Sequence, residues 1–203
     1  MNKTVVILLM FCFIGCDNQK TINPEEISKK TSEKFDLALF NSNKKGNLYE
    51  YLLGDTIVRL YAEDNFYKKE LSFDNYAFKS VLVYSKTTNM LVSDFFYFYG
   101  MPIGIWKTYD ENGNLVNEKN NDEGFDFAVK DLIGMFKKEL QIDLINDDNY
   151  KSLVVNRFSD TTFYVLKNCH YLIEIATVEG IRTIKVDGND GAVLNDETVF
   201  AEE

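Results

Sequence analysis

The sequence predicts an α+β protein, in which an antiparallel β-meander is followed by one long helix packed on a second antiparallel sheet. Three observations favour this class. Short apolar and aromatic runs separated by turn residues fill the region from about 47 to 120. The apolar spacing changes to three and four residues at Phe125, and short runs return after residue 150. This order of strands, helix and strands is typical of α+β folds.

The chain opens with a segment typical of an export signal. Lys3 is followed by an uncharged apolar run that ends at Gly15, which is too short to span a bilayer. The residues Phe13-Ile14-Gly15-Cys16 resemble the lipobox of bacterial lipoproteins, whose cysteine receives a diacylglyceryl group before cleavage. The resemblance implies that residues 1–15 are removed and that Cys16 becomes the lipidated first residue. Cys12 is a competing lipidation site, and an ordinary secretory peptide is the alternative.

The resemblance also implies a location and an arrangement of regions. Acyl chains on Cys16 would hold the protein on a membrane of a Gram-negative cell envelope, at the periplasmic face or the cell surface. Residues 16–34 are polar and are predicted to form a flexible tether. We expect a β-rich region at 35–124 and a helix-plus-sheet region at 125–203, which form either one domain or two.

The amino-acid composition limits the classes of molecule that the chain is expected to bind. The formal net charge of −10 argues against nucleic acid binding, because phosphates attract a basic surface. An acidic surface favours solubility first and a basic partner second. With 45% apolar and 14% aromatic residues, the chain can bury a core. If Cys12 leaves with the signal and Cys16 carries lipid, Cys169 has no disulfide partner within the chain, so the core alone must hold the fold.

Alternating apolar residues and turn-forming connectors place the strands of the meander. The connectors include Gly54-Asp55, Asp64-Asn65 and Asn112-Gly113-Asn114, which tolerate tight turns. We expect strands at 48–53, 56–62, 66–73, 78–84, 90–99, 103–109 and 115–118.

The change of period at Phe125 predicts the single long helix. Its apolar stripe consists of Val129, Leu132, Ile133, Phe136 and Leu140. Asp126 is the expected N-cap, and Phe125 with Val129 has nearly the spacing of a hydrophobic staple. Gly134 weakens the helix by about 1 kcal/mol relative to Ala, so tertiary packing must support it. Strands are then expected at 152–158, 163–167, 171–179 and 181–186, with a closing run at 192–194.

Two stretches resemble known families. Residues 98–115 contain Gly104, Trp106, Tyr109, Asp110, Gly113 and Leu115 in the register of one MORN-variant repeat, as found in bacterial antitoxin-like proteins. Residues 125–194 are similar to PepSY-like domains of exported proteins, in which a helix covers an antiparallel sheet. There Asp187, Gly191 and Val193 match the last hairpin. The resemblances imply a non-catalytic protein, similar to lipoproteins that act as immunity proteins against toxins.

Few residues suggest catalysis or metal binding. His170 is the only histidine, and its neighbour Cys169 would point to the other face of a strand, so a Cys-His pair is not expected. Cys169 is predicted to be a small core residue and His170 a surface one. Asp187 begins a segment like a calcium loop, but Thr198 stands where the bidentate Glu belongs, which favours a turn. The acidic clusters at 122–123, 147–148 and 202–203 are expected to be solvated. We expect no enzymatic activity, cofactor or metal.

The aromatic run at 95–99 is the remaining feature. As a strand, it would expose rings on both faces, which requires burial between two layers or a protein partner. Tyr97, Tyr99, Trp106 and Tyr109 are therefore the candidate partner-binding residues. The sequence-based hypothesis is a lipoprotein that binds and neutralises a secreted antibacterial toxin. An envelope hydrolase, a small-ligand carrier and a structural lipoprotein are the alternatives.

Overall fold

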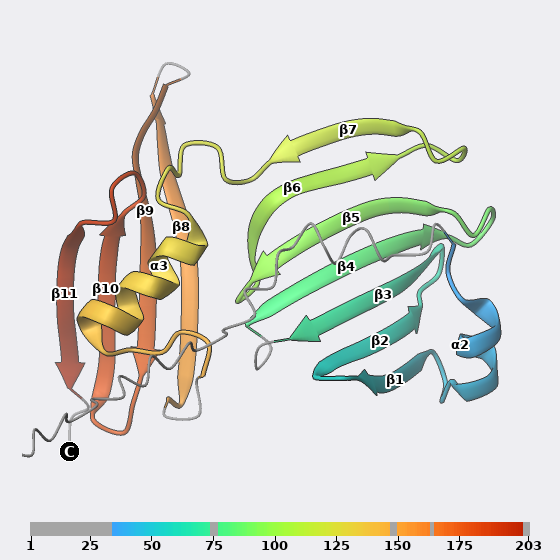
Figure 1. The fold of residues 1–203 in the computed structure, drawn as a ribbon, viewed down its shortest axis with the longest axis horizontal. Coiled ribbons are helices and arrows are strands. Elements are labelled where there is room, and N and C mark those ends of the chain that lie inside the picture. Colours follow the sequence, from blue (N-terminus) through green and yellow to red (C-terminus); the bar gives the residue numbers. More distant parts are fainter. Residues whose placement is uncertain (1–33, 74–76, 147–149, 163–164, 201–203) are drawn as a thin grey trace, which may run out of the picture.

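The computed structural model describes residues 34–73, 77–146, 150–162 and 165–200. The expected signal peptide, Cys16 and all of the expected tether except Lys34 lie outside these residues. Strands make up 57% of the chain and helices 12%, in two antiparallel sheets, so the expected α+β class with one long helix is wrong. The protein is mostly β, and the α-helices of the described part are short. Figure 1 shows the two sheets side by side.

The larger sheet is a seven-stranded antiparallel meander in sequence order. Its first three strands have the bounds that alternation and turn residues predict. The others differ from the prediction by one or two residues at their ends. The strands are β1 (Leu48–Leu53), β2 (Thr56–Ala62), β3 (Phe66–Phe73), β4 (Phe78–Ser85), β5 (Leu91–Phe98), β6 (Met101–Tyr109) and β7 (Leu115–Asn120).

A short helix that the periodicity did not predict precedes this sheet. Helix α2 (Leu37–Asn43) begins after Asp36, whose carboxylate accepts a hydrogen bond from the backbone N–H of Leu39 at 2.9 Å. Phe40 is its one buried residue, and it packs with Phe35 and Tyr67. Figure 1 shows α2 at the end of the sheet that lies away from the second sheet. Seven residues carry too little apolar periodicity to identify a helix from sequence.

The MORN-like stretch forms the hairpin of β6 and β7. One carboxylate oxygen of Asp110 accepts hydrogen bonds from the backbone N–H groups of Asn112 and Asn114, at 2.9 and 2.8 Å. The side-chain amide of Asn114 donates to the other carboxylate oxygen at 2.9 Å, and this bond, together with the backbone bonds, lowers the pKa of Asp110. Gly113 has a φ of +85°, which glycine adopts without steric cost. Local turn chemistry therefore sets this hairpin.

The smaller sheet has four antiparallel strands in the order β11-β10-β9-β8. They are β8 (Ser152–Thr162), β9 (Val165–Ala176), β10 (Gly180–Asp187) and β11 (Val193–Phe200). Three expectations are wrong. β8 continues to Thr162, beyond the expected end at Phe158. The separate strands expected at 163–167 and 171–179 form the single strand β9 within the described residues, and the closing run continues to Phe200. β9 stays continuous because it pairs with β8 on one side and β10 on the other.

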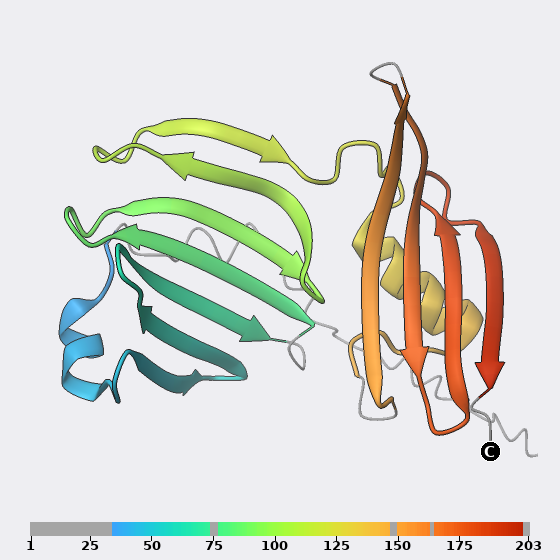
Figure 2. The same ribbon diagram turned by 180° about the vertical axis from the view of Figure 1, so that it is seen from behind.

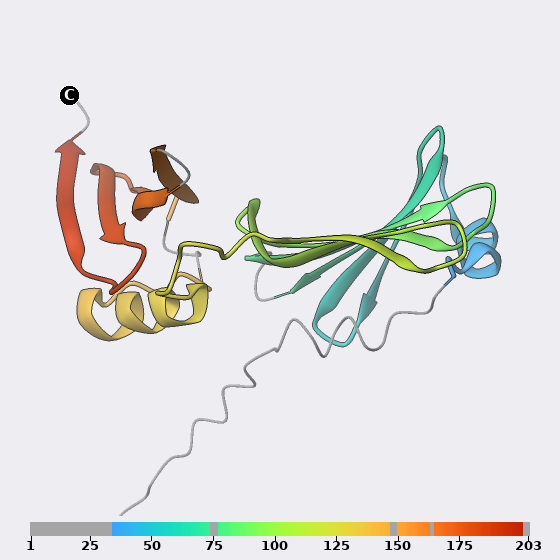
Figure 3. The same cartoon turned by 90° about the horizontal axis from the view of Figure 1, so that it is seen from above.

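The expected long helix is much shorter. Helix α3 (Val129–Met135) passes into a π-helical turn, η1 (Phe136–Leu140), which ends at Gln141 in the left-handed conformation. Asp126 is not the N-cap. Ala128 is the N-cap, without a side-chain hydrogen bond, because the backbone N–H of Phe127 bonds to the carbonyl oxygen of Gly188 and keeps the preceding residues out of the helix. Figure 3 shows α3 on one side of the smaller sheet, and Figure 2 shows the opposite side of that sheet.

One hydrophobic core joins the two sheets. The larger sheet contributes Phe96, Phe98, Met101 and Ile103. The other part contributes residues of α3, η1 and the smaller sheet, including Leu132, Phe136, Leu144, Tyr171, Ile173 and Ile184. A second core lies between α2 and the other end of the larger sheet, around Val58, Leu60 and Leu82. Both cores lie on the same side of the meander, which leaves its other side for solvent or a partner.

Arg157 on β8 stabilises the segment that connects the two sheets. Its guanidinium group forms an ion pair with Asp122 at 2.5 Å and donates hydrogen bonds to the carbonyl oxygen of Asn121 and the hydroxyl of Tyr171, both at 3.1 Å. It also lies over the ring of Phe125, 4.7 Å from the centroid. Because the Arg157 side chain is 8% exposed, it holds the segment between β7 and α3 to β8.

Candidate protein-binding face

Three rings and two lysines lie together on the meander, on the side opposite both cores. We call this group the aromatic face and define it as Phe95, Tyr97, Trp106, Lys79 and Lys119. In an antiparallel sheet, directly paired residues point to the same side. Lys79 pairs with Tyr97, and Trp106 pairs with Lys119. Register thus brings residues from four neighbouring strands, β4 to β7, into one patch.

A bulge in β6 positions Trp106. Phe96 pairs with Ile103 and Asp94 with Lys107, so residues 104–106 stand opposite the single residue Phe95. Gly104 begins the bulge with a φ of +64°. The indole N–H of Trp106 donates to the carbonyl oxygen of Phe96 at 3.1 Å, which locks the ring over β5.

The rings and lysines contact one another. The Trp106 ring lies 4.8 Å from the ring of Phe95 and 5.3 Å from that of Tyr97, centroid to centroid. The Nζ of Lys79 is 5.5 Å from the Tyr97 centroid, and the Nζ of Lys119 is 5.9 Å from the Trp106 centroid. These are cation–π distances. The two lysines therefore lie at the edges of the ring surface. The three rings and Lys79 are half-buried, and Lys119 is exposed.

The same side of the sheet continues over β1 to β3 with paired charges. Arg59 and Glu50 form an ion pair at 2.5 Å. Burial raises the pKa of Tyr61, and the negative charge of Glu70 raises it further. Burial also raises the pKa of Tyr97, the charge of Lys68 lowers it and the charge of Glu70 raises it, so both charged groups face the same side as Tyr97.

Positive charge exceeds negative charge on this side of the meander. The cross-strand register places Arg59, Lys68, Lys79 and Lys119 there with Glu50 and Glu70, and Glu63 joins them through its ion pair with Lys68, which leaves an excess of one positive charge. All three glutamates lie on or beside β1 to β3, and none of the carboxylates described on β4 to β7 points to this side. The chain as a whole has a net charge of −10. The aromatic face is therefore locally positive on an acidic protein.

The structure separates the four tyrosine and tryptophan residues that the sequence grouped. Tyr97 and Trp106 are together on the aromatic face. Tyr99 lies in the β5–β6 turn, and its hydroxyl donates to the carbonyl oxygen of Leu144 at 2.7 Å, so it supports the joint between the sheets. Tyr109 lies on the other side of the meander, where burial and the charge of Asp94 raise its pKa. The sequence did not identify Lys79 and Lys119 as members of the site. Each lies on a strand next to one that carries a ring, and alternation along the strand was the available signal.

A buried carboxyl group on the core side was also missed. Asp94 is 5% exposed, and burial raises its pKa to about 6, while Lys107 acts in the opposite direction. Tyr84 lies close enough for the charge of Asp94 to add to the burial that raises the Tyr84 pKa. In the described part of the chain, Asp94 Oδ1, Tyr84 OH and Ser80 Oγ are buried without hydrogen-bond partners. Tyr84 itself belongs to the second core, and Asp94 and Ser80 face the same side of the sheet.

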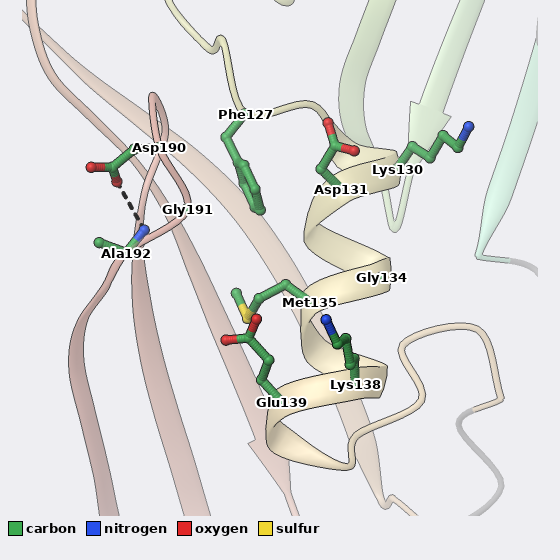
Figure 4. Close-up of a pocket in the computed structure, with 10 residues that line it drawn as sticks. All are labelled: Phe127, Lys130, Asp131, Gly134, Met135, Lys138, Glu139, Asp190, Gly191 and Ala192. Carbon is green, nitrogen blue, oxygen red and sulfur yellow. Dashed lines mark hydrogen bonds between the residues drawn. The ribbon is translucent and has the colours of Figure 1, made fainter.

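An open groove lies between α3 and the β10–β11 turn, with a volume of about 590 Å³. Figure 4 shows Phe127 and Met135 directed toward the turn, with Lys130, Asp131, Lys138 and Glu139 along the helix. The turn interpretation of Asp187 is confirmed, because its carboxylate accepts the backbone N–H of Asn189 at 2.7 Å.

The other candidate chemical residues occupy structural positions. Cys169 is buried at 3% exposure, which confirms the core prediction, and His170 stacks on Phe158 with ring centroids 5.4 Å apart. Of the acidic clusters, 147–148 and 202–203 lie outside the described residues, and Asp122 is paired with Arg157. Among the described residues, no group of three or more His, Cys, Asp or Glu side chains could hold a metal ion.

Comparison with protein-family models, with curated proteins and with solved structures gives no match. Within the described residues, every helix is too short or too polar to cross a membrane.

Proposed function

We propose that this chain is a lipid-anchored protein of the bacterial envelope that binds another protein, and that it acts as an immunity protein against a secreted antibacterial toxin. The lipobox-like start with Cys16 supports the anchoring. The observation that carries the binding role is the aromatic face, where Phe95, Tyr97 and Trp106 adjoin on the side opposite both cores. Trp and Tyr are the residues that most often dominate the binding energy of protein interfaces.

The proposed action requires no reaction at the aromatic face. A toxin is neutralised when a bound protein covers its active surface, which needs shape and charge complementarity alone. A rigid sheet suits this purpose, because its side chains are held by cross-strand contacts and lose little conformational entropy on binding. Lipid on Cys16 would keep the protein on the envelope, where an incoming toxin first arrives.

A competition experiment tests the role without knowledge of the toxin. The gene is deleted, and the deletion strain is grown with its toxin-producing parent. We expect the deletion strain to be killed and to be rescued by the wild-type gene. A Cys16→Ala gene should rescue poorly, because the protein would be mislocated. Equal survival of the deletion strain and the parent in co-culture would refute the immunity role.

Variants of the aromatic face connect the role to the structure. Removing one central ring from an interface costs about 2 kcal/mol, or roughly thirtyfold in affinity. Trp106→Ala and Tyr97→Ala should therefore lose most of the rescue. Phe158→Ala is the matched control, since it removes an exposed ring from the smaller sheet, and it should rescue fully. Thermal unfolding of each purified variant checks that loss of rescue is not loss of folding.

A further inference from the structure

We infer that the aromatic face recognises an acidic segment of a partner protein, with side-chain carboxylates placed between Lys79 and Lys119 and an apolar or aromatic group on the rings of Tyr97 and Trp106. This inference rests on the protein-binding role proposed above and gives its partner a chemical class. It is opposite to what the net charge of the chain suggests, because an acidic protein as a whole favours a basic partner.

The charges on β4 to β7 favour an acidic ligand. On β4 to β7 the aromatic face has two lysines and no described carboxylate on its side of the sheet. The nearest acidic groups on that side are Glu70 on β3, whose charge acts on Tyr97, and Glu50 and Glu63, which are paired with Arg59 and Lys68. A carboxylate approaching the rings therefore meets two ammonium groups that form no ion pair with any described residue.

The two lysines are already held in place by the rings beneath them. Each ammonium group lies over a ring, Lys79 over Tyr97 and Lys119 over Trp106. These contacts restrict the lysines before a partner arrives, so less side-chain entropy is lost when a carboxylate binds. Because Tyr97 and Trp106 themselves adjoin, the two positive groups flank one continuous ring surface. This arrangement fits a short segment that has both carboxylates and an apolar side chain.

The limited extent of the positive patch favours a protein segment over a membrane or a nucleic acid. Bilayers of anionic lipid and polyphosphate chains present negative charge over a large area, which would also meet the acidic remainder of this chain. With a net charge of −10, that remainder would be repelled. A protein loop presents its carboxylates locally and can reach the patch alone.

The single tryptophan gives a direct test, because Trp106 is the only one in the chain and lies in the proposed site. The purified full chain is titrated with a random copolymer of glutamate and tyrosine, and tryptophan emission is excited selectively. We expect a saturable change that weakens with added salt. Polylysine and vesicles of phosphatidylglycerol are the comparison probes, and they should cause no comparable change.

Charge-reversal variants complete the test. Lys79→Glu with Lys119→Glu should weaken binding of the copolymer by about tenfold or more. Lys130→Glu on α3 makes the same kind of charge change at an exposed site away from the face and should bind like wild type. No response to the copolymer, an equal response to polylysine, a stronger response to the vesicles, or unchanged binding by the double variant would each overturn the inference.

The co-culture assay separates the two proposals. If the deletion strain is killed but the double lysine variant rescues it as well as wild type does, the immunity role stands and the acidic-partner inference fails. If the deletion strain survives while the copolymer binds as expected, the immunity role fails and the recognition chemistry stands.

Discussion

Replacing Asp94 by Asn should stabilise the protein at neutral and alkaline pH and have little effect in acid. Asp94 is 5% exposed, and burial raises its pKa from the ordinary 3.8 to about 6. The folded state therefore favours the protonated carboxyl group. The protonated Asp94 side chain therefore contributes fully to the free energy of unfolding below about pH 4. This contribution is lost as the pH rises through about 6 and the buried group ionises. The shift corresponds to roughly 3 kcal/mol, and Asn, which never ionises, avoids this loss.

Urea unfolding of wild type and Asp94→Asn at about pH 4 and about pH 8 measures the effect. The free energy of unfolding of the variant relative to wild type should increase by about 2 to 3 kcal/mol between the two conditions. Asp110→Asn is the control. Hydrogen bonds from Asn114 and Asn112 lower the pKa of Asp110, so the free energy of unfolding of this variant relative to wild type should decrease, not increase, from about pH 4 to about pH 8. An effect of Asp94→Asn that is equal at both pH values would refute a buried carboxyl group with a raised pKa.

Two further predictions concern the joint between the sheets and the β10–β11 turn. Arg157→Ala should lower the free energy of unfolding by about 2 kcal/mol, because the buried guanidinium and its hydrogen bonds to Asn121 and Tyr171 are removed, while Asp122 is exposed enough to be solvated. A loss below about 1 kcal/mol in urea unfolding would contradict that role. Gly191→Ala should cost about 2 kcal/mol, because a Cβ would lie 2.4 Å from the Phe127 ring at a φ of +79°. Gly54→Ala, with a similar φ and open space, should cost less, and equal shifts in Tm would argue against the ring clash.

Short-range preferences explain why the meander could be predicted. The bounds of β1, β2 and β3 follow from alternating side chains and from turn residues such as Gly54 and Asp64. The β6–β7 turn depends on Asp110 and Gly113, which lie within the turn itself. Each of these features involves residues only a few positions apart, so the local sequence contains the necessary information.

The helix and the smaller sheet were harder to predict because distant contacts decide them. The apolar stripe from Phe125 onward has helical spacing, yet the helix begins only at Val129 because Phe127 bonds to Gly188. β9 runs continuously through a region that reads as two strands, since its two neighbouring strands satisfy its backbone groups. Neither contact can be inferred from periodicity.

For the candidate site, the sequence by itself determined that rings are concentrated at 95–99 and that Trp106 lies in a strand of the same meander. Only the tertiary structure decided that Tyr97 and Trp106 meet, that Tyr99 supports the joint between the sheets, and that Lys79 and Lys119 frame the rings. The physical reason is that residue type and alternation follow from covalent neighbours, whereas the bulge at Gly104 and the cross-strand register depend on segments that pair only after folding.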